Sequence, residues 1–236
     1  MPALLQIEDL HTYFSTKEGI VKAVNGVSLS LHENSILGLV GESGSGKTMT
    51  ALSILQLVPF PGQVVSGSIT YDGQDLLKMP TNKMRRIRGK EISLIFQDAG
   101  AALNPVISVG KQVEELMLEH TDMSKRQARS FSADLLTQMG IPDADQMLDR
   151  YPFQLSGGMA QRVLLAIGVA LKPRVLIADE PTSNLDVTLQ AEILQRLRIL
   201  REESGTAILL ITHDLGVIAQ MAENVAVMYG GFIVEF

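Results

Sequence analysis

The chain has 236 residues and a formal net charge of −6; 46% of its residues are hydrophobic and 19% are charged. This length favours one domain with an inserted part, and the hydrophobic content excludes a disordered chain. The acidic balance argues against nucleic acid as the main partner, and the lack of cysteine excludes disulfides and cysteine-ligated metals within the chain.

The amino-terminal part is predicted to begin with antiparallel strands. Its first residues lack the pattern of a secretory signal. Residues 1–35 and 64–72 are typical of antiparallel strands at one side of the fold. Residues 36–40 form a continuous apolar run, which indicates a strand buried on both faces. A helical pattern over residues 47–58 follows, and Pro59 is expected to end that helix.

Four further apolar runs predict buried strands, and each run ends in small or polar residues. They cover residues 92–96, 175–178, 207–211 and 225–229. Residues 187–203 predict a helix with Asp186 as its amino-terminal cap and Gly205 after its end. Its expected apolar face contains Val187, Gln190, Ile193, Leu194, Leu197 and Leu200. Strands that alternate with helices predict an α/β fold, in which ligands bind at the carboxyl ends of the strands.

Residues 98–165 have a different pattern, typical of a helical subdomain. Ser124 and Gln127 have the spacing of a capping box at the start of a predicted helix over residues 124–139. A second helix is expected over residues 106–118. The longest apolar run, residues 163–171, is too short to span a membrane. We therefore predict a single domain over residues 1–236, with residues 98–165 inserted into an α/β core made of 1–97 and 166–236.

A phosphate-binding loop is the most specific local motif. Residues 41–48 have the sequence GESGSGKT, which matches G-x-x-x-x-G-K-[ST] between a predicted strand and a predicted helix. Loop N–H groups and Lys47 would bind phosphate oxygens, and Thr48 would offer its hydroxyl to magnesium. Asp179, at a predicted strand end, would complete the magnesium ligands. Glu180 would orient or deprotonate an attacking water.

Residues 155–158 have the sequence LSGG and precede a predicted helix over residues 159–171. This motif, about twenty residues before the Asp-Glu pair, resembles the signature of ABC transporter ATPases. Gln97 resembles the Q-loop glutamine of this family, residues 183–186 its D-loop, and His213 its switch histidine. Phe14, with Tyr13 as the alternative, lies where the family places an aromatic side chain against adenine.

The resemblance implies a P-loop NTPase fold of the RecA-like type, with a mainly parallel sheet, an antiparallel β subdomain and the helical insert. It implies ATP hydrolysis with magnesium, between two chains that close head to tail. The implied catalytic residues are Lys47, Gln97, Glu180 and His213. The implied nucleotide-binding residues are Tyr13, Phe14, Gly41, Ser43, Gly44, Ser45, Gly46, Lys47, Thr48, Ser156, Gly157, Gly158, Met159 and Asp186. The implied magnesium ligands are Thr48, Gln97 and Asp179.

Longer sequence strings, among them YPFQLSGGMAQR and IADEPTSNLDVTLQAEI, resemble the importer branch for dipeptides, oligopeptides and nickel. This implies an ATPase subunit on the cytoplasmic face of the cell membrane, bound to a second ATPase chain and two permease subunits. A solute-binding protein would act indirectly. Residues 99–119 are expected to face the permease or to pack within the insert. Members of this branch usually extend past the core, so the chain is either truncated or a shorter relative.

Two other functions remain open from sequence alone. An ABC-type ATPase of a nucleic-acid machine is one, although the short distance between Thr48 and Ser156 leaves no room for long coiled coils and no nucleic acid partner is expected. A nucleotide-dependent dimerisation module without hydrolysis is the other. The intact Lys47, Glu180 and His213 favour hydrolysis over that alternative.

Overall fold

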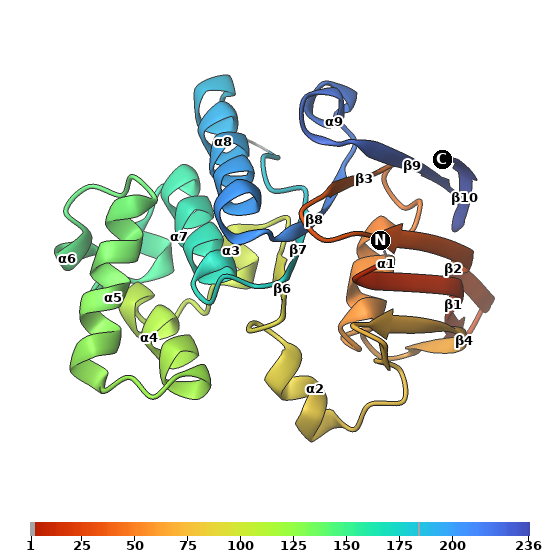
Figure 1. Ribbon diagram of the computed structural model, residues 1–236, viewed down its shortest axis with the longest axis horizontal. Coiled ribbons are helices and arrows are strands. Elements are labelled where there is room, and N and C mark those ends of the chain that lie inside the picture. Colours follow the sequence, from red (N-terminus) through yellow and green to blue (C-terminus); the bar gives the residue numbers. More distant parts are fainter. Residues whose placement is uncertain (1–2, 184) are drawn as a thin grey trace.

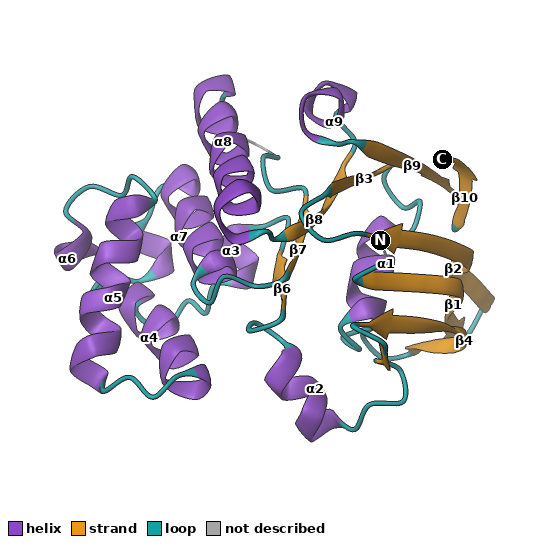
Figure 2. Ribbon diagram, viewed as in Figure 1, coloured by secondary structure: helices purple, strands orange, loops and turns teal. Residues whose placement is uncertain are grey.

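The computed structural model describes residues 3–183 and 185–236, which build two sheets and the helices around them (Figures 1 and 2). The four-stranded sheet is antiparallel and has the order β2-β1-β4-β5. Its strands are β1 (Leu5–Thr16), β2 (Gly19–Leu31), β4 (Gly62–Tyr71) and β5 (Gln74–Asp75). The predicted antiparallel strands near the amino end are therefore confirmed.

The six-stranded sheet has the order β10-β9-β3-β8-β7-β6. Its strands are β3 (Ile36–Val40), β6 (Ile92–Ile95), β7 (Val175–Asp179), β8 (Ala207–Thr212), β9 (Asn224–Tyr229) and β10 (Phe232–Glu235). All neighbours pair in parallel except β10, which is antiparallel to β9. The five predicted strands are confirmed, although Phe96 lies outside β6 and is 39% exposed. The burial expected for residues 225–229 is only partly present, since Ala226 and Met228 are buried in β9 whereas Tyr229 is 63% exposed.

Alternate residues of the parallel strands enter different hydrophobic cores, which explains their continuous apolar sequences. In β8, Ile208 and Leu210 belong to the core on the helical side, while Leu209 and Ile211 belong to the core that includes β1 and β2. Both cores exclude water almost completely at these positions. The helices α7 and α8 cover the first face, and α1 with the antiparallel sheet covers the second (Figure 1).

The helices lie mainly between β6 and β7 in the chain. They are α1 (Lys47–Ile54), α2 (Thr81–Ile87), α3 (Ala99–Ala102), α4 (Val109–His120), α5 (Lys125–Gln138), α6 (Ala144–Met147), the short 3₁₀ turn η1 (Pro152–Gln154), α7 (Gly157–Val169), α8 (Val187–Ser204) and α9 (Leu215–Met221). In Figure 1, α4, α5 and α6 lie at the opposite end of the molecule from the antiparallel sheet. Each helix in the described ranges is too short or too polar to cross a bilayer.

Several predicted helix boundaries are wrong for local reasons. The helix over 47–58 ends at Ile54, because Gln56 adopts a left-handed φ of 52° and Leu57 N–H bonds back to the Leu52 carbonyl at 2.8 Å. The helix over 106–118 begins only at Val109, since the Gln112 side chain holds the backbone of residues 104–107 in a turn.

Two other differences concern α7 and α8. Helix α7 begins at Gly157, two residues before the prediction, because the Ser156 hydroxyl accepts a hydrogen bond from Met159 N–H. In α8, Asp186 and Gly205 cap the helix as predicted, and Ile193, Leu194 and Leu197 are buried. Val187, however, is 84% exposed, because it occupies the first turn beyond the packed face.

The capping box of α5 is a local stabilising feature that can be tested. The Ser124 side chain accepts from Gln127 N–H, and the Gln127 side chain accepts from Ser124 N–H. We expect Ser124→Ala to lower the free energy of unfolding by about 0.5–2 kcal/mol, because the first turn loses its cap. The matched control is Ser130→Ala on the exposed middle of the same helix. Alanine favours a helix interior, so the control should not destabilise the chain. Urea unfolding followed by circular dichroism measures both, and equal stabilities of the two variants would contradict the prediction.

Candidate functional site

The carboxyl ends of β3, β6, β7 and β8 surround a cavity of about 550 Å³. Its walls include most of the residues predicted from the phosphate loop and strand-end motifs. They are Ser43, Gly44, Gly46, Lys47, Thr48, Gln97, Asp179, Glu180 and His213. These residues come from four separate sequence segments, and parallel pairing brings them together.

The phosphate loop packs so closely against its surroundings that two of its positions admit only glycine. A Cβ on Gly41 would lie 2.1 Å from the Met228 carbonyl oxygen, and one on Gly46 would lie 2.2 Å from the Ala23 carbonyl oxygen. Gly46 also has a φ of 107°, which other residues rarely adopt. The loop is therefore wedged between β2 and β9, at the start of α1.

Lys47 is a buried cation whose ammonium group lies within the loop. Its Nζ donates to the carbonyl oxygens of Gly41 at 2.7 Å and Glu42 at 2.8 Å. Burial lowers the pKa of Lys47, whereas the nearby carboxylates of Glu180 and Asp179 raise it. A poorly hydrated cation of this kind interacts strongly with an anion that enters the cavity.

Asp179 is a second buried charge at the cavity, with 2% of its surface exposed. Its Oδ1 atom has no hydrogen-bond partner among residues 3–183 and 185–236. Burial raises the pKa of Asp179, while the Thr48 hydroxyl and the Lys47 ammonium lower it and Glu180 raises it further. An unpartnered buried carboxylate oxygen beside a hydroxyl fits the oxygen ligands that magnesium prefers. Within the described ranges, no group of three or more His, Cys, Asp or Glu side chains is arranged so that it could hold a metal ion by itself, so phosphate oxygens would have to complete a metal site.

Glu180 and His213 form a pair at the cavity wall. Glu180 Oε1 lies 2.7 Å from His213 Nδ1. The carboxylate is buried, whereas the histidine side chain is 67% exposed. Glu180 has an unusual left-handed φ of 49°, and its N–H donates to the Ile211 carbonyl at 2.8 Å. Backbone strain of this kind is typical of functional sites, and here it directs the carboxylate toward the cavity.

The residues of the signature lie elsewhere. Ser156, Gly158 and Met159 line a separate pocket of about 360 Å³, together with Asp186 and Leu189. Among the residues that the structure describes, none lines both this pocket and the phosphate cavity. Gly157 is open, since a Cβ there would meet nothing within 4 Å. Asn184, in the predicted D-loop, lies outside the described residues.

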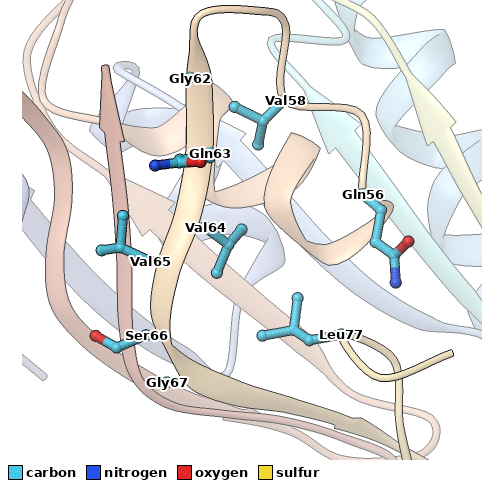
Figure 3. A pocket seen from close by; sticks show the side chains of 9 residues that line it. All are labelled: Gln56, Val58, Gly62, Gln63, Val64, Val65, Ser66, Gly67 and Leu77. Atoms are coloured by element: carbon cyan, nitrogen blue, oxygen red, sulfur yellow. The ribbon is translucent and has the colours of Figure 1, made fainter. Parts of the chain in front are cut away.

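Neither predicted adenine-binding aromatic lines the phosphate cavity. The Phe14 ring packs against Gly62, at the end of a groove of about 390 Å³ beside β4 that Figure 3 shows. The Tyr13 hydroxyl instead donates to Asn25 Oδ1 at 2.6 Å. The assignment of either ring to adenine therefore stays a prediction. The groove in Figure 3 contains none of the predicted site residues.

Three residues at the cavity were not predicted. Ala23, Glu42 and Met49 also line it. Glu42 and Met49 lie within or beside the recognised loop motif, which could have indicated them. Ala23 belongs to β2, and its approach to the loop depends on how the two sheets pack, so no local pattern marks it.

Comparison with known proteins identifies the family. The model of the ABC transporter family matches residues 24–183, and a model of an AAA domain matches residues 148–219. The chain is 46% identical to the Bacillus subtilis oligopeptide transport ATP-binding protein OppD, over 98% of this chain and 65% of OppD. It is 45% identical to the B. subtilis dipeptide transport ATP-binding protein DppD, over 100% of this chain and 70% of DppD. The chain thus spans about two thirds of the length of these relatives.

Solved structures of ATP-binding cassettes have the same fold as this chain. The dimeric ATP-binding cassette MJ0796, in a post-hydrolysis state bound to ADP and Pi, superimposes with a TM-score of 0.88 at 26% identity and covers 98% of this chain and 97% of that one. A second dimeric MJ0796 structure, described as a bacterial ABC transporter cassette, gives the same values. With the phosphate loop, the buried Asp179 and the Glu180–His213 pair all at one cavity, this chain belongs to the ABC transporter family and has the P-loop ATPase fold of its ATP-binding cassettes.

Proposed function

We propose that this chain is the ATP-hydrolysing subunit of an ABC importer that takes up peptides or a related solute such as nickel complexes. The main support for the ATPase function is the cavity that the phosphate loop lines together with Asp179, Glu180 and His213. The names of the relatives OppD and DppD support peptides as the solute.

The residues of the cavity divide the chemistry between binding and proton transfer. The loop N–H groups and Lys47 bind the phosphates, and they stabilise charge that develops during the reaction. Glu180 accepts a proton from the attacking water. The contact between His213 Nδ1 and Oε1 of Glu180 orients this carboxylate and leaves Oε2 for the water. Gln97, exposed at the cavity wall after β6, would contact the magnesium and the water.

Magnesium would be held by Thr48, Asp179 and Gln97, together with phosphate oxygens of ATP. Bound there, it would neutralise phosphate charge and polarise the transferred group. The unpartnered Oδ1 of Asp179 supports this assignment.

The separation of the two pockets supports a composite site. The signature residues Ser156, Gly158 and Met159 line a pocket other than the phosphate cavity of their own chain, and Gly157 lines neither. The start of α7, which the exposed Ser156 caps, would bind the phosphates of an ATP held by a second chain. That chain is either identical or homologous, and Asp186 would lie at the interface.

The transport partners follow from the same proposal. Residues 99–119 would face one of two permease subunits at the cytoplasmic side of the membrane, and a solute-binding protein would act indirectly. In this segment Val106 is 79% exposed, whereas Ala99 and Leu103 are buried. Phe153, just before the signature in the sequence, is 73% exposed. The division of the chain into a core and an inserted helical subdomain over 98–165 also stays a prediction.

The catalytic assignment predicts that Glu180→Gln retains ATP binding and loses hydrolysis by at least about 100-fold, because amide oxygen is too weak a base for the water. Phosphate release measures the hydrolysis, and equilibrium binding of a fluorescent ATP analogue measures the affinity. The control is Glu42→Gln, which removes a carboxylate from the same cavity but not the proposed base. Turnover by Glu180→Gln at the wild-type rate would show that another group accepts the proton.

The buried charge of Asp179 predicts a trade-off between stability and magnesium binding. Asp179→Asn should raise the free energy of unfolding at neutral pH by about 1–3 kcal/mol, because it removes an incompletely bonded buried carboxylate. Since its raised pKa means that the folded chain binds this proton more tightly than the unfolded chain, the gain should fade as pH falls through the folded-state pKa. Magnesium should also cease to strengthen ATP binding.

Urea unfolding at several pH values and ATP titrations with and without magnesium measure these effects. Asp143→Asn removes an exposed charge that lines neither the phosphate cavity nor the signature pocket and serves as the control, with an expected change within about 0.5 kcal/mol. An Asp179→Asn chain that is less stable at neutral pH, or that keeps its magnesium dependence, would argue against the assignment.

The composite site predicts complementation between two inactive chains. Lys47→Ala removes phosphate binding, and Ser156→Arg blocks the exposed signature of the other half-site. Each variant alone should hydrolyse ATP at a few per cent of the wild-type rate or less. In an equal mixture, half of the dimers contain one chain of each variant. Each of these mixed dimers has one intact site out of two, so the mixture should recover about a quarter of the wild-type rate. Phosphate release by the mixture measures this, and no recovery where the wild-type chain is active alone would exclude a site shared between identical chains.

A further inference from the structure

The turn between β9 and β10 contacts the phosphate loop on the side away from the cavity. Gly231 N–H donates to the Ser45 carbonyl at 3.0 Å, and the Gly231 carbonyl accepts from Asn25 N–H at 2.7 Å. We call these two hydrogen bonds the Gly231 bridge. The bridge joins the loop to β2, although its three members lie far apart in the sequence.

The bridge determines the direction of one N–H group of the loop. The Ser45 carbonyl and the Gly46 N–H belong to the same planar trans peptide, so they point in opposite directions. Gly231 holds the carbonyl on one side, and Gly46 lines the cavity on the other. Ser45 is 4% exposed, so water cannot readily replace Gly231 as the donor. Holding the carbonyl therefore keeps the Gly46 N–H directed at a bound phosphate.

Gly231 is confined by its neighbours. It has a φ of 91°, and a Cβ there would lie 2.9 Å from the Lys22 carbonyl oxygen. Its neighbour Gly230 also has a positive φ, of 54°, but a Cβ on Gly230 would meet nothing within 4 Å. Both glycines of this turn therefore have a positive φ, but only Gly231 lacks room for a side chain.

Asn25, the other end of the bridge, is itself held by β1. Its Oδ1 accepts a hydrogen bond from the Tyr13 hydroxyl at 2.6 Å and lies 3.1 Å from His11 Nδ1. The Lys22 ammonium lies 5.5 Å from the centre of the Tyr13 ring. These contacts restrict the Asn25 side chain, so its backbone N–H keeps its direction toward Gly231.

We propose that Gly231, Asn25 and Tyr13 are positioning residues that fix the Ser45–Gly46 peptide of the phosphate loop and so set its affinity for the phosphates of a nucleotide. This inference rests on the proposed function of the loop. It assigns to Tyr13 a role through its hydroxyl group, at the back of the loop, instead of contact with adenine.

The first test is the affinity of the purified chain for MgADP and for magnesium pyrophosphate, measured by calorimetry. Loss of one hydrogen bond in the bridge corresponds to about a two- to tenfold weaker affinity. We expect this loss in Gly231→Ala for both ligands and by the same factor, because pyrophosphate has no adenine. Gly230→Ala, the matched control, should bind both ligands like the wild-type chain.

The second test separates positioning from adenine stacking and from damage to the fold. Tyr13→Phe keeps the ring and removes the hydroxyl, and we expect it to weaken both ligands by about two- to tenfold. Tyr229→Phe, on an exposed tyrosine in β9, is its control. A purely structural defect would lower the number of binding sites per chain without changing the dissociation constant.

The outcomes are distinct. If Gly231→Ala and Tyr13→Phe bind pyrophosphate as tightly as the wild-type chain, the proposed role of the bridge is wrong. If Tyr13→Phe weakens neither ligand but Tyr13→Ala weakens MgADP alone, Tyr13 contacts adenine and has no positioning role. A wild-type chain that binds neither ligand would contradict the proposed function, and this inference would fall with it.

Discussion

Parallel pairing of β3, β7 and β8 is the constraint on which the rest of the site depends. Val40, the last residue before the phosphate loop, pairs with Thr212, and Asp179 pairs with Ile211. The loop, the Asp-Glu pair and His213 therefore begin at neighbouring positions of one sheet edge. A slip of one residue would move every side chain to the opposite face. Because the two faces of these strands are packed in separate cores, such a slip would place each side chain in the core that does not fit it, and the register is held by packing.

The same packing keeps water away from three charged side chains at this edge of the sheet. Lys47, Asp179 and Glu180 are each less than a tenth exposed, so their charges are weakly screened by water. Their unfavourable burial is only partly offset, by loop carbonyls for Lys47 and by His213 for Glu180. Asp179 keeps an unpartnered oxygen. A site of this kind is organised before a ligand arrives, so little reorganisation is needed during the reaction.

In the proposed mechanism, the separation of the phosphate cavity from the signature pocket is what makes hydrolysis depend on a second chain. In that mechanism each chain would present two halves of different sites, one with the phosphate loop and one with the start of α7. Hydrolysis would then wait for two chains to close, which is how ATP could be coupled to movement of a partner. The exposed ends of both halves, Ser156 on one side and His213 on the other, suit such an interface.

The sequence by itself determined the elements and the chemistry. Continuous apolar runs identified the buried strands, because strands covered on both faces have no polar side. The motif over residues 41–48 and the Asp-Glu pair identified the phosphate site, since the required residues are adjacent in the chain. Capping at Ser124 and Asp186 was also visible, because a cap acts on its own first turn.

Only the tertiary structure decided which distant segments support the loop. The left-handed turn at Gln56 ends α1 before Pro59, and no glycine marks it in the sequence. Ala23, Met228 and Gly231 approach the phosphate loop from β2 and the β9–β10 hairpin. Tyr13 and Phe14, adjacent in β1, have different neighbours, with Tyr13 bonded to Asn25 and Phe14 packed on Gly62. These contacts depend on how two sheets pack against each other, and that packing is a property of the whole chain which no local pattern encodes.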